Sequence, residues 1–170
     1  MRKNLLTTKS KHGDNSSGEN YVNEALDKYV NETWKATLDG RIIMKLMKIT
    51  IPCTKWNNPY VTTAERQVWV PARGEIDSSF SEKYTAICFP YFETITTNAA
   101  RIAYDDNGTA QAWWTRSCVE GTNPYVRVVN ASGAFSNYNQ TNNLGVRPVF
   151  CLPNSLPVSL ISEGQYDLIL

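Results

Sequence analysis

The segment that most constrains the fold is residues 113–117, in which two adjacent tryptophans, Trp113 and Trp114, precede Thr-Arg-Ser. Successive side chains of a β-strand point to opposite faces, so a strand here would place its two indoles on different sides of a sheet. A second apolar segment with an arginine, residues 145–150 (Gly-Val-Arg-Pro-Val-Phe), follows later in the chain. We expect the two segments to pack together as a rigid floor beneath a displayed layer of loops.

Charge and composition narrow the classes of function. The chain has 170 residues, 42% of them hydrophobic, which suits one globular domain with a buried core. Its 17 Lys and Arg residues against 16 Asp and Glu residues give a net charge of +1. A net charge this small gives no strong electrostatic attraction to nucleic acid. No apolar run approaches the roughly 20 residues that span a bilayer, and the N-terminal residues lack the apolar stretch of a signal peptide. We therefore expect no nucleic-acid partner, no membrane insertion and no signal peptide.

The hydrophobic pattern is helical at first and strand-like afterwards. Apolar residues such as Leu26 and Val30 recur at helical spacing and predict a helix over residues 21–38, with Asn20 as its N-cap. Asp39 is placed to cap a short second helix over residues 41–47. Helices followed by short antiparallel strands indicate the α+β class.

The strand-like part is divided by turn signals. Residues 105–108 (Asp-Asp-Asn-Gly) predict a tight turn, and residues 130–133 (Asn-Ala-Ser-Gly) predict the turn of a hairpin. We expect residues 54–65 to form a loop and residues 72–83 a polar connection. The expected strands are 48–52, 67–71, 101–104, 110–116, 125–129, 134–138 and 146–152.

Composition divides the chain into three parts. Residues 1–19 are polar and are expected to form a flexible or extended tail. Residues 20–157 hold the periodic elements and form the predicted domain. Residues 158–170 are too apolar for a solvated end, so we expect this segment to pack on the domain or on a partner.

The four cysteines, Cys53, Cys88, Cys118 and Cys151, are widely spaced and form no C-x-x-C pair. Their neighbours are mostly apolar or prolyl, which favours free thiols that behave as small hydrophobic side chains. A disulfide framework or a zinc site is the alternative. A mixed His/Cys zinc site is disfavoured because the only histidine, His12, lies in the polar tail.

Three motifs in this order resemble a family of uncharacterised domains from gut Firmicutes and their phages and prophages. They are residues 101–104 (Arg-Ile-Ala-Tyr), 113–117 (Trp-Trp-Thr-Arg-Ser) and 145–153 (Gly-Val-Arg-Pro-Val-Phe-Cys-Leu-Pro). The family has Trp-Trp-Leu-Arg-Ser-Pro and Gly-Val-Arg-Pro at the last two. Cys118 stands where the family has proline, which puts the local loop geometry in doubt.

That family is similar in turn to the C-type lectin-like superfamily, in the branch of formylglycine-generating enzymes and phage tropism determinants. The resemblance implies a C-type lectin-like fold of helices, short twisted antiparallel strands and long loops. Family members carry strands before the first helix, so a partner subunit or the tail would supply them here. An unpaired edge favours assembly, and we expect a homo-oligomer that contacts other virion subunits. The structural motif would consist of Trp113, Trp114, Arg116, Gly145 and Arg147.

The residue types give little support to catalysis or to a cofactor. With His12 alone, a histidine-based triad has no basis. Asp105 and Asp106 are turn formers, and the glutamates are scattered, which disfavours a paired-carboxylate glycosidase and a calcium site. We expect Arg116 and Arg147 to bond backbone carbonyls or a buried carboxylate. The chain is therefore predicted to be no enzyme and to hold no metal or cofactor.

Residues 120–143 are the candidate binding surface. They combine Tyr, Ser and Asn, which antibodies use for adaptable recognition, and aromatic faces beside amides also suit sugars. An ordinary polar hairpin is the alternative. The candidate ligand-binding residues are Tyr125, Asn130, Phe135, Asn137, Tyr138, Asn139 and Asn142.

The leading hypothesis is a non-enzymatic phage or prophage structural protein whose lectin-like domain binds a host surface glycan or protein. It would act in receptor binding on a tail fibre, baseplate or capsid, and would lie in the virion or, before assembly, in the bacterial cytoplasm. A purely architectural capsid or tail decoration subunit is the second hypothesis. A glycan or cell-wall hydrolase is the third.

Overall fold

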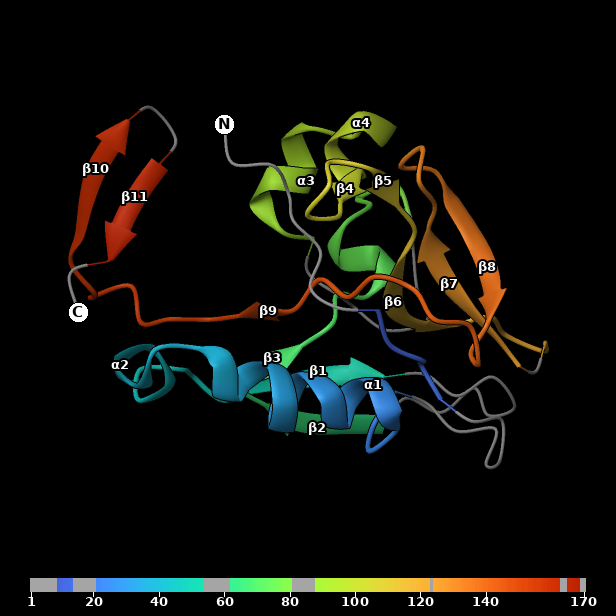
Figure 1. Cartoon of the computed structure of the whole chain (residues 1–170), viewed down its shortest axis with the longest axis horizontal. Helices are drawn as coiled ribbons and strands as arrows, with labels where there is room; N and C mark the ends of the chain where they lie inside the picture. Colours follow the sequence, from blue (N-terminus) through green and yellow to red (C-terminus); the bar gives the residue numbers. More distant parts are fainter. Residues whose placement is uncertain are drawn as a thin grey trace.

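The computed structural model describes residues 9–13, 21–53, 62–80, 88–122, 124–162 and 165–168. They form an α+β arrangement of short helices and small antiparallel sheets, as the sequence predicts. In Figure 1 the first helices lie beside strands β1, β2 and β3 in the lower part of the view, and strands β6, β7 and β8 lie above them at the right. Among the described residues, no helix has the length and apolar character needed to span a membrane.

The first helix is confirmed, with three successive types of turn. It begins as α1 (Ala25–Lys28), continues as the π-helical η1 (Tyr29–Trp34) and ends as the 3₁₀ turn η2 (Lys35–Thr37). Leu26 and Val30, four residues apart, are both buried, so the predicted apolar stripe faces the core. The predicted cap Asn20 lies outside the described residues.

A second helix is present after Asp39, but it is shorter than the predicted 41–47: α2 spans the four residues Gly40–Ile43. The Asp39 side chain accepts a hydrogen bond of 2.8 Å from the backbone N–H of Arg41, which satisfies one of the free donors at the helix start.

Strand β1 (Ile49–Cys53) pairs antiparallel with β2 (Thr62–Arg66), with Ile51 opposite Ala64. β1 was predicted, but the predicted loop over 54–65 is wrong at its C-terminal end, and residues 54–61 lie outside the described residues. Only the small Ala64 of β2 packs against the core, so the hydrophobic alternation of this strand is too weak to detect.

Strand β3 (Val68–Trp69) pairs with β9 (Val149–Phe150), which joins the middle of the chain to its closing segment. The predicted strand over 146–152 is thus reduced to two residues. Pro148 has no N–H to donate to a ladder, and the backbone of Gly145 is already bonded to Ala112 and Trp114.

The predicted hairpins are both present. β4 (Ala103–Tyr104) and β5 (Ala110–Gln111) flank the first turn. β6 (Trp113–Cys118), β7 (Tyr125–Val129) and β8 (Phe135–Asn139) form a three-stranded antiparallel sheet in that order.

Turn chemistry explains the β7–β8 hairpin. The Asn130 side-chain oxygen accepts hydrogen bonds from the backbone N–H groups of Ser132 and Ala134, and Gly133 adopts a φ of 81°. A Cβ at Gly133 would lie 1.9 Å from the carbonyl oxygen of Asn98, so only glycine fits there.

Three short helices lie in segments where none was predicted. The 3₁₀ turn η3 (Arg73–Glu75) occupies the expected polar connection. α3 (Pro90–Thr94) begins with proline at its first turn, and α4 (Asn98–Arg101) precedes β4. Each is too short to carry a helical hydrophobic period.

Two hydrophobic clusters form the core, and β6 lies between them. Trp114 packs with Leu26, Val30 and the β1 and β3 residues, whereas Trp113 packs with Ile76, Phe92 and their neighbours. Both indoles are almost completely buried. The prediction that the two rings enter different faces is therefore confirmed.

The two ends of the chain differ in their contacts. Ser10 forms a bridge with Leu144, and His12 is fully buried, so residues 9–13 are extended against the domain. At the other end, β10 (Val158–Ser162) and β11 (Gln165–Leu168) form a hairpin that stands apart from the other strands in Figure 1.

Candidate functional site

The predicted floor is confirmed as a packed unit. All six residues of β6 are buried. Gly145 lies beside Trp113 in a parallel bridge, donates its N–H to the carbonyl of Ala112 at 2.9 Å and accepts from the N–H of Trp114 at 3.1 Å. The guanidinium of Arg147 stacks over the Trp113 ring at 4.6 Å from its centroid. The two sequence motifs thus pack against each other.

Arg116 forms a buried ion pair with Glu75. Its Nη1 and Nη2 donate to the two carboxylate oxygens at 2.6 and 2.7 Å. Arg116 also donates to the carbonyls of Val70 and Pro52, and Glu75 accepts from the N–H of Ala72. The expected bonding of Arg116 to carbonyls or a buried carboxylate is confirmed, and both kinds are present.

Arg147 has a much poorer set of partners. Its Nη1 donates to the carbonyl of Arg101 at 3.4 Å, a long hydrogen bond, and that carbonyl also accepts from the indole N–H of Trp113 at 2.9 Å. Burial lowers the pKa of Arg147 to about 10. The expected carbonyl contact is present, but no carboxylate among the described residues forms an ion pair with Arg147.

The β7–β8 hairpin divides the candidate binding residues between its two faces. Tyr125 lies opposite Asn139, and Tyr138 lies opposite Val126, whose side chain enters the core. Directly opposite residues share a face, so Tyr125 and Asn137 lie on one face, here called the outer face, and Tyr138 on the other. Near the turn the outer face also packs inward, because Val129 is buried in the second hydrophobic cluster with Phe135 against it. Tyr125 is 40% exposed and Tyr138 is 37% exposed.

The asparagines of this region serve partly as turn formers. The Oδ1 atom of Asn130 accepts from Ser132, and that of Asn139 accepts from the N–H and hydroxyl of Thr141. Asn137 and Asn142 are exposed. Of the predicted set, the structure therefore presents Tyr125 and Asn137 together on one outward surface.

Phe135 belongs to a stack of rings and guanidinium groups that the sequence did not reveal. Its ring lies 4.2 Å from the Arg73 guanidinium carbon and 4.6 Å from that of Arg101. Arg73 also lies 3.9 Å from the Phe80 ring, which Arg127 approaches at 5.0 Å. Cation–π contacts of this kind stabilise this face of the hairpin, and the charge of Arg73 is paired with Asp77 at 3.2 Å. The members are far apart in sequence, so no local pattern marks them.

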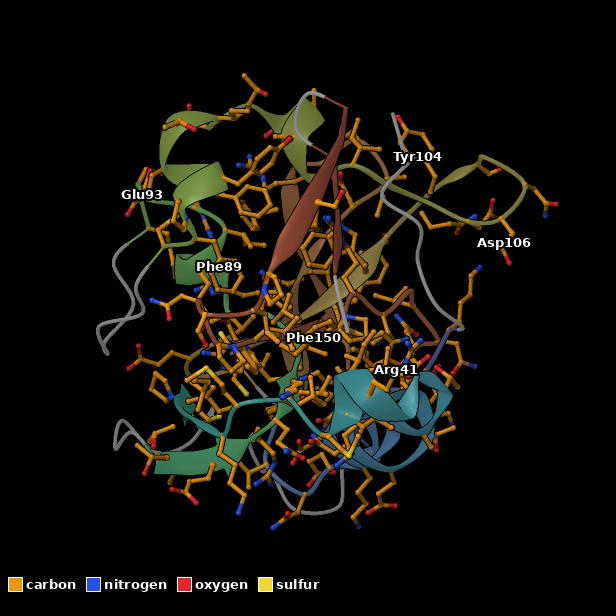
Figure 2. All side chains as sticks on the ribbon, turned by 90° about the vertical axis from the view of Figure 1, so that its left-hand side faces the viewer. Arg41, Phe89, Glu93, Tyr104, Asp106 and Phe150 are labelled. Atoms are coloured by element: carbon orange, nitrogen blue, oxygen red, sulfur yellow. The ribbon has the colours of Figure 1, made fainter. Side chains whose placement is uncertain are left out.

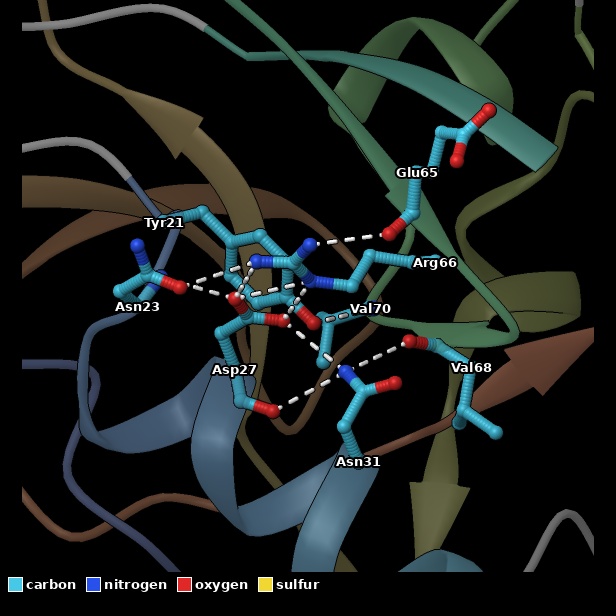
Figure 3. A network of polar contacts seen from close by, with 8 residues as sticks. All are labelled: Tyr21, Asn23, Asp27, Asn31, Glu65, Arg66, Val68 and Val70. Atoms are coloured by element: carbon cyan, nitrogen blue, oxygen red, sulfur yellow. Dashed lines mark hydrogen bonds and ion pairs between the residues drawn. The ribbon is translucent and has the colours of Figure 1, made fainter. Parts of the chain in front are cut away.

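A second buried carboxylate, Asp27, anchors the first helix (Figure 3). It accepts from Nη2 of Arg66 at 2.7 Å, from Nδ2 of Asn31 at 2.9 Å and from the N–H of Asn23 at 2.8 Å. Asn31 also donates to the carbonyl of Val68. The network ties the helix to β2 and β3, which is a structural role.

The carboxylates considered as a glycosidase pair do not face one another across a shared site. Glu75 is occupied by Arg116, and Asp105 accepts from the N–H groups of Asn107 and Thr109 within its turn. Figure 2 shows Glu93 and Asp106 at opposite sides of the molecule. In the part of the chain that the structure describes, no group of three or more His, Cys, Asp or Glu is arranged to hold a metal ion.

All four cysteines are free, which confirms the expected thiols. Cys53, Cys88 and Cys118 are buried. Burial raises the pKa of Cys53 to about 11 and also raises the pKa of Cys88 and Cys151. These thiols are therefore protonated near neutral pH and are poor nucleophiles.

His12 is fully buried although the sequence placed it in a polar tail. Its ring meets Trp114 edge-on at 5.5 Å, and neither ring nitrogen has a hydrogen-bond partner among the described residues. Burial lowers the pKa of His12 to about 3. His12 is thus a neutral core residue that helps to fix residues 9–13.

Comparison with known proteins gives the family of the chain. Neither the curated proteins nor the solved structures contain a match. A family model described as "Domain of unknown function (DUF6273)" matches residues 1–154, so the match includes the predicted tail and the whole region from the first helix to β9. The chain therefore belongs to the DUF6273 family.

Proposed function

We propose that this chain is a non-enzymatic recognition domain that binds a host surface component, a glycan or a protein, through the outer face of its β7–β8 hairpin. The observation that carries the proposal is the exposure of Tyr125 and Asn137 on one face of the hairpin, beyond the point where Val129 and Phe135 of that face pack in the second hydrophobic cluster. Tyrosine offers a rigid ring for stacking on a sugar, and an amide supplies both a donor and an acceptor.

The outer face of the hairpin rests on buried strands, which favours it as a binding surface. β7 pairs with the fully buried β6, and Val126 and Val128 of β7 are themselves buried. A ligand that meets side chains on such a strand pair orders few additional groups, so less affinity is lost to conformational entropy.

We also propose a C-type lectin-like arrangement within a phage-derived particle. Support for the arrangement comes from Gly145 and Arg147, which contact Trp113 as expected for the closing core segment of that superfamily. Support for the virion comes from the motif resemblance alone. In the described sheet, β8 pairs only with β7, so its outer edge is available to other subunits.

One observation favours the architectural alternative, a capsid or tail decoration subunit. The β10–β11 hairpin stands apart from the other strands (Figure 1). An isolated two-stranded hairpin is only marginally stable in water, so contact with a partner surface would stabilise it. The two functions are compatible within one particle.

Binding to host cells and to a glycan array tests the recognition function with matched variants. Tyr125→Ala with Asn137→Ala removes the outer-face pair and is expected to weaken binding at least about tenfold, as loss of an interface centre does. Tyr138→Ala removes a tyrosine of nearly equal exposure from the other face and is expected to retain binding. Loss of binding on Tyr138→Ala alone would place the site on the opposite face. Absence of any binding by the unmodified protein would favour the architectural role.

A further inference from the structure

A small cavity lies beside the double-indole strand, and none of its lining residues comes from β7 or β8. Its walls are mostly apolar and aromatic, and its volume is about 110 Å³. Phe89 and Phe92 come from the start of α3, Trp113 from β6, and Val149 from β9. Figure 2 shows Phe89 on the side of the molecule that faces the viewer. The cavity is partly open to solvent.

The lining contains one charged side chain, Arg147. A guanidinium has five N–H donors, and among the described residues Arg147 has a single long hydrogen bond of 3.4 Å and a stacking contact with Trp113. Arg66 and Arg116, by contrast, each hold a carboxylate through two nitrogens. Arg147 therefore keeps donor capacity at the wall of an apolar cavity.

Placing a cation in apolar surroundings is unfavourable, and an anion at the same place removes much of that cost. The lowered pKa of Arg147, about 10, has desolvation as its main cause and is consistent with this position. The guanidinium remains protonated at neutral pH. A planar carboxylate matches its geometry through two parallel hydrogen bonds.

We propose that this cavity binds a small organic monocarboxylate, with its carboxylate on Arg147 and its short apolar tail against Phe89, Phe92 and Trp113. Size sets the length of the tail. A cavity of roughly 150 Å³ accommodates benzene, so about 110 Å³ suits an acid of two to four carbons. The site is separate from the outer face of β7–β8 and goes beyond the proposed recognition function.

Titration of the full chain with propionate and with propionamide tests the proposal without any mutation. The two probes have nearly the same shape and differ in charge. We expect propionate to shift the indole N–H resonance of Trp113, assigned with Trp113→Phe, and propionamide to bind at least about tenfold more weakly. Equal binding of both probes, or no response to propionate up to about 50 mM, would overturn the proposal, since that concentration exceeds the millimolar range of weak ligands.

Two variants locate the anion contact. Arg147→Gln is expected to reduce propionate affinity at least about tenfold, because it removes the charge and the paired donors. Arg41→Gln is the matched control, since Arg41 is exposed on α2 and pairs with Asp39. Unchanged propionate affinity in a folded Arg147→Gln protein would contradict the assignment. If that variant fails to fold, the comparison of propionate with propionamide on the unmodified chain still tests whether the cavity binds a carboxylate.

Discussion

Arg116 and Arg147 belong to the two motifs that form the floor of this domain, yet their surroundings differ in kind. Arg116 is fully buried and bonds a carboxylate and two backbone carbonyls. Arg147 stacks on an indole and has one long hydrogen bond. Arg147 is also partly exposed, whereas Arg116 is not. The number of an arginine's donors that the protein itself satisfies distinguishes a structural bridge from a candidate ligand contact.

The largest expected effect concerns Arg116. Glu75→Gln leaves a fully buried guanidinium without its counter-charge, so we expect the free energy of unfolding to fall by about 3–5 kcal/mol. Urea denaturation followed by circular dichroism measures it. Arg41→Gln should leave stability unchanged, and a Glu75→Gln protein as stable as the unmodified one would show that the Arg116 region is not held by this pair.

The Asp27 network provides a paired arginine that is less deeply buried. Asp27→Asn removes the charge opposite Arg66, whose side chain is 20% exposed and can regain water. We therefore expect a smaller loss of about 1–3 kcal/mol in the same measurement. If Asp27→Asn lowered the free energy of unfolding as much as Glu75→Gln, the burial of the paired arginine would not determine the size of the loss.

His12 extends the comparison to a buried group with no polar partner. Its pKa falls from about 6.5 in the unfolded chain to about 3 in the folded one, so only the unfolded state takes up a proton between these values. The contribution of His12 to the free energy of unfolding is therefore fully present above pH 6.5. Between pH 6.5 and about pH 3 it is lost as the pH falls, by about 1.4 kcal/mol per pH unit.

Denaturation at several pH values, with His12→Phe as the reference, isolates this contribution. Phenylalanine does not titrate, so the pH dependence of the difference between the two proteins belongs to His12. Parallel stability curves from pH 7 to pH 4 would show that the imidazole is solvated in the folded protein.

The smallest stability effect is expected at Arg147 itself. Arg147→Met replaces an unpaired cation by an apolar side chain of similar length, and we expect the free energy of unfolding to change by less than about 1 kcal/mol in either direction. Thermal and urea unfolding both report it. Destabilisation as large as that of Glu75→Gln would make Arg147 a structural bridge like Arg116.

Local sequence patterns predicted the elements whose structure depends on residues close together in the chain. The helix that buries Leu26 and Val30 follows from their spacing, and the β7–β8 hairpin follows from the turn chemistry of Asn130 and Gly133. Alternation along a strand also explains why Trp113 and Trp114 enter different clusters.

The remaining features depend on contacts between distant residues. Glu75 and Arg116 are 41 positions apart, and the two arginines that stack on Phe135 come from two separate segments. β2 was missed because the residues it exposes are polar and only Ala64 packs inward. His12 was assigned to a solvated segment because its neighbours in sequence are polar, whereas its neighbours in space are Tyr21 and Trp114. The recognition role and the lectin-like arrangement remain predictions.

Strand β6 contributes Trp114 to one hydrophobic cluster and Trp113 to the other. Neither half of the molecule can therefore lose its structure without stripping one face of the strand on which the other half depends. The described domain should melt in a single cooperative transition, and a fragment cut before β6 should not hold its shape alone. Any ligand that stabilises one half would thereby protect the whole.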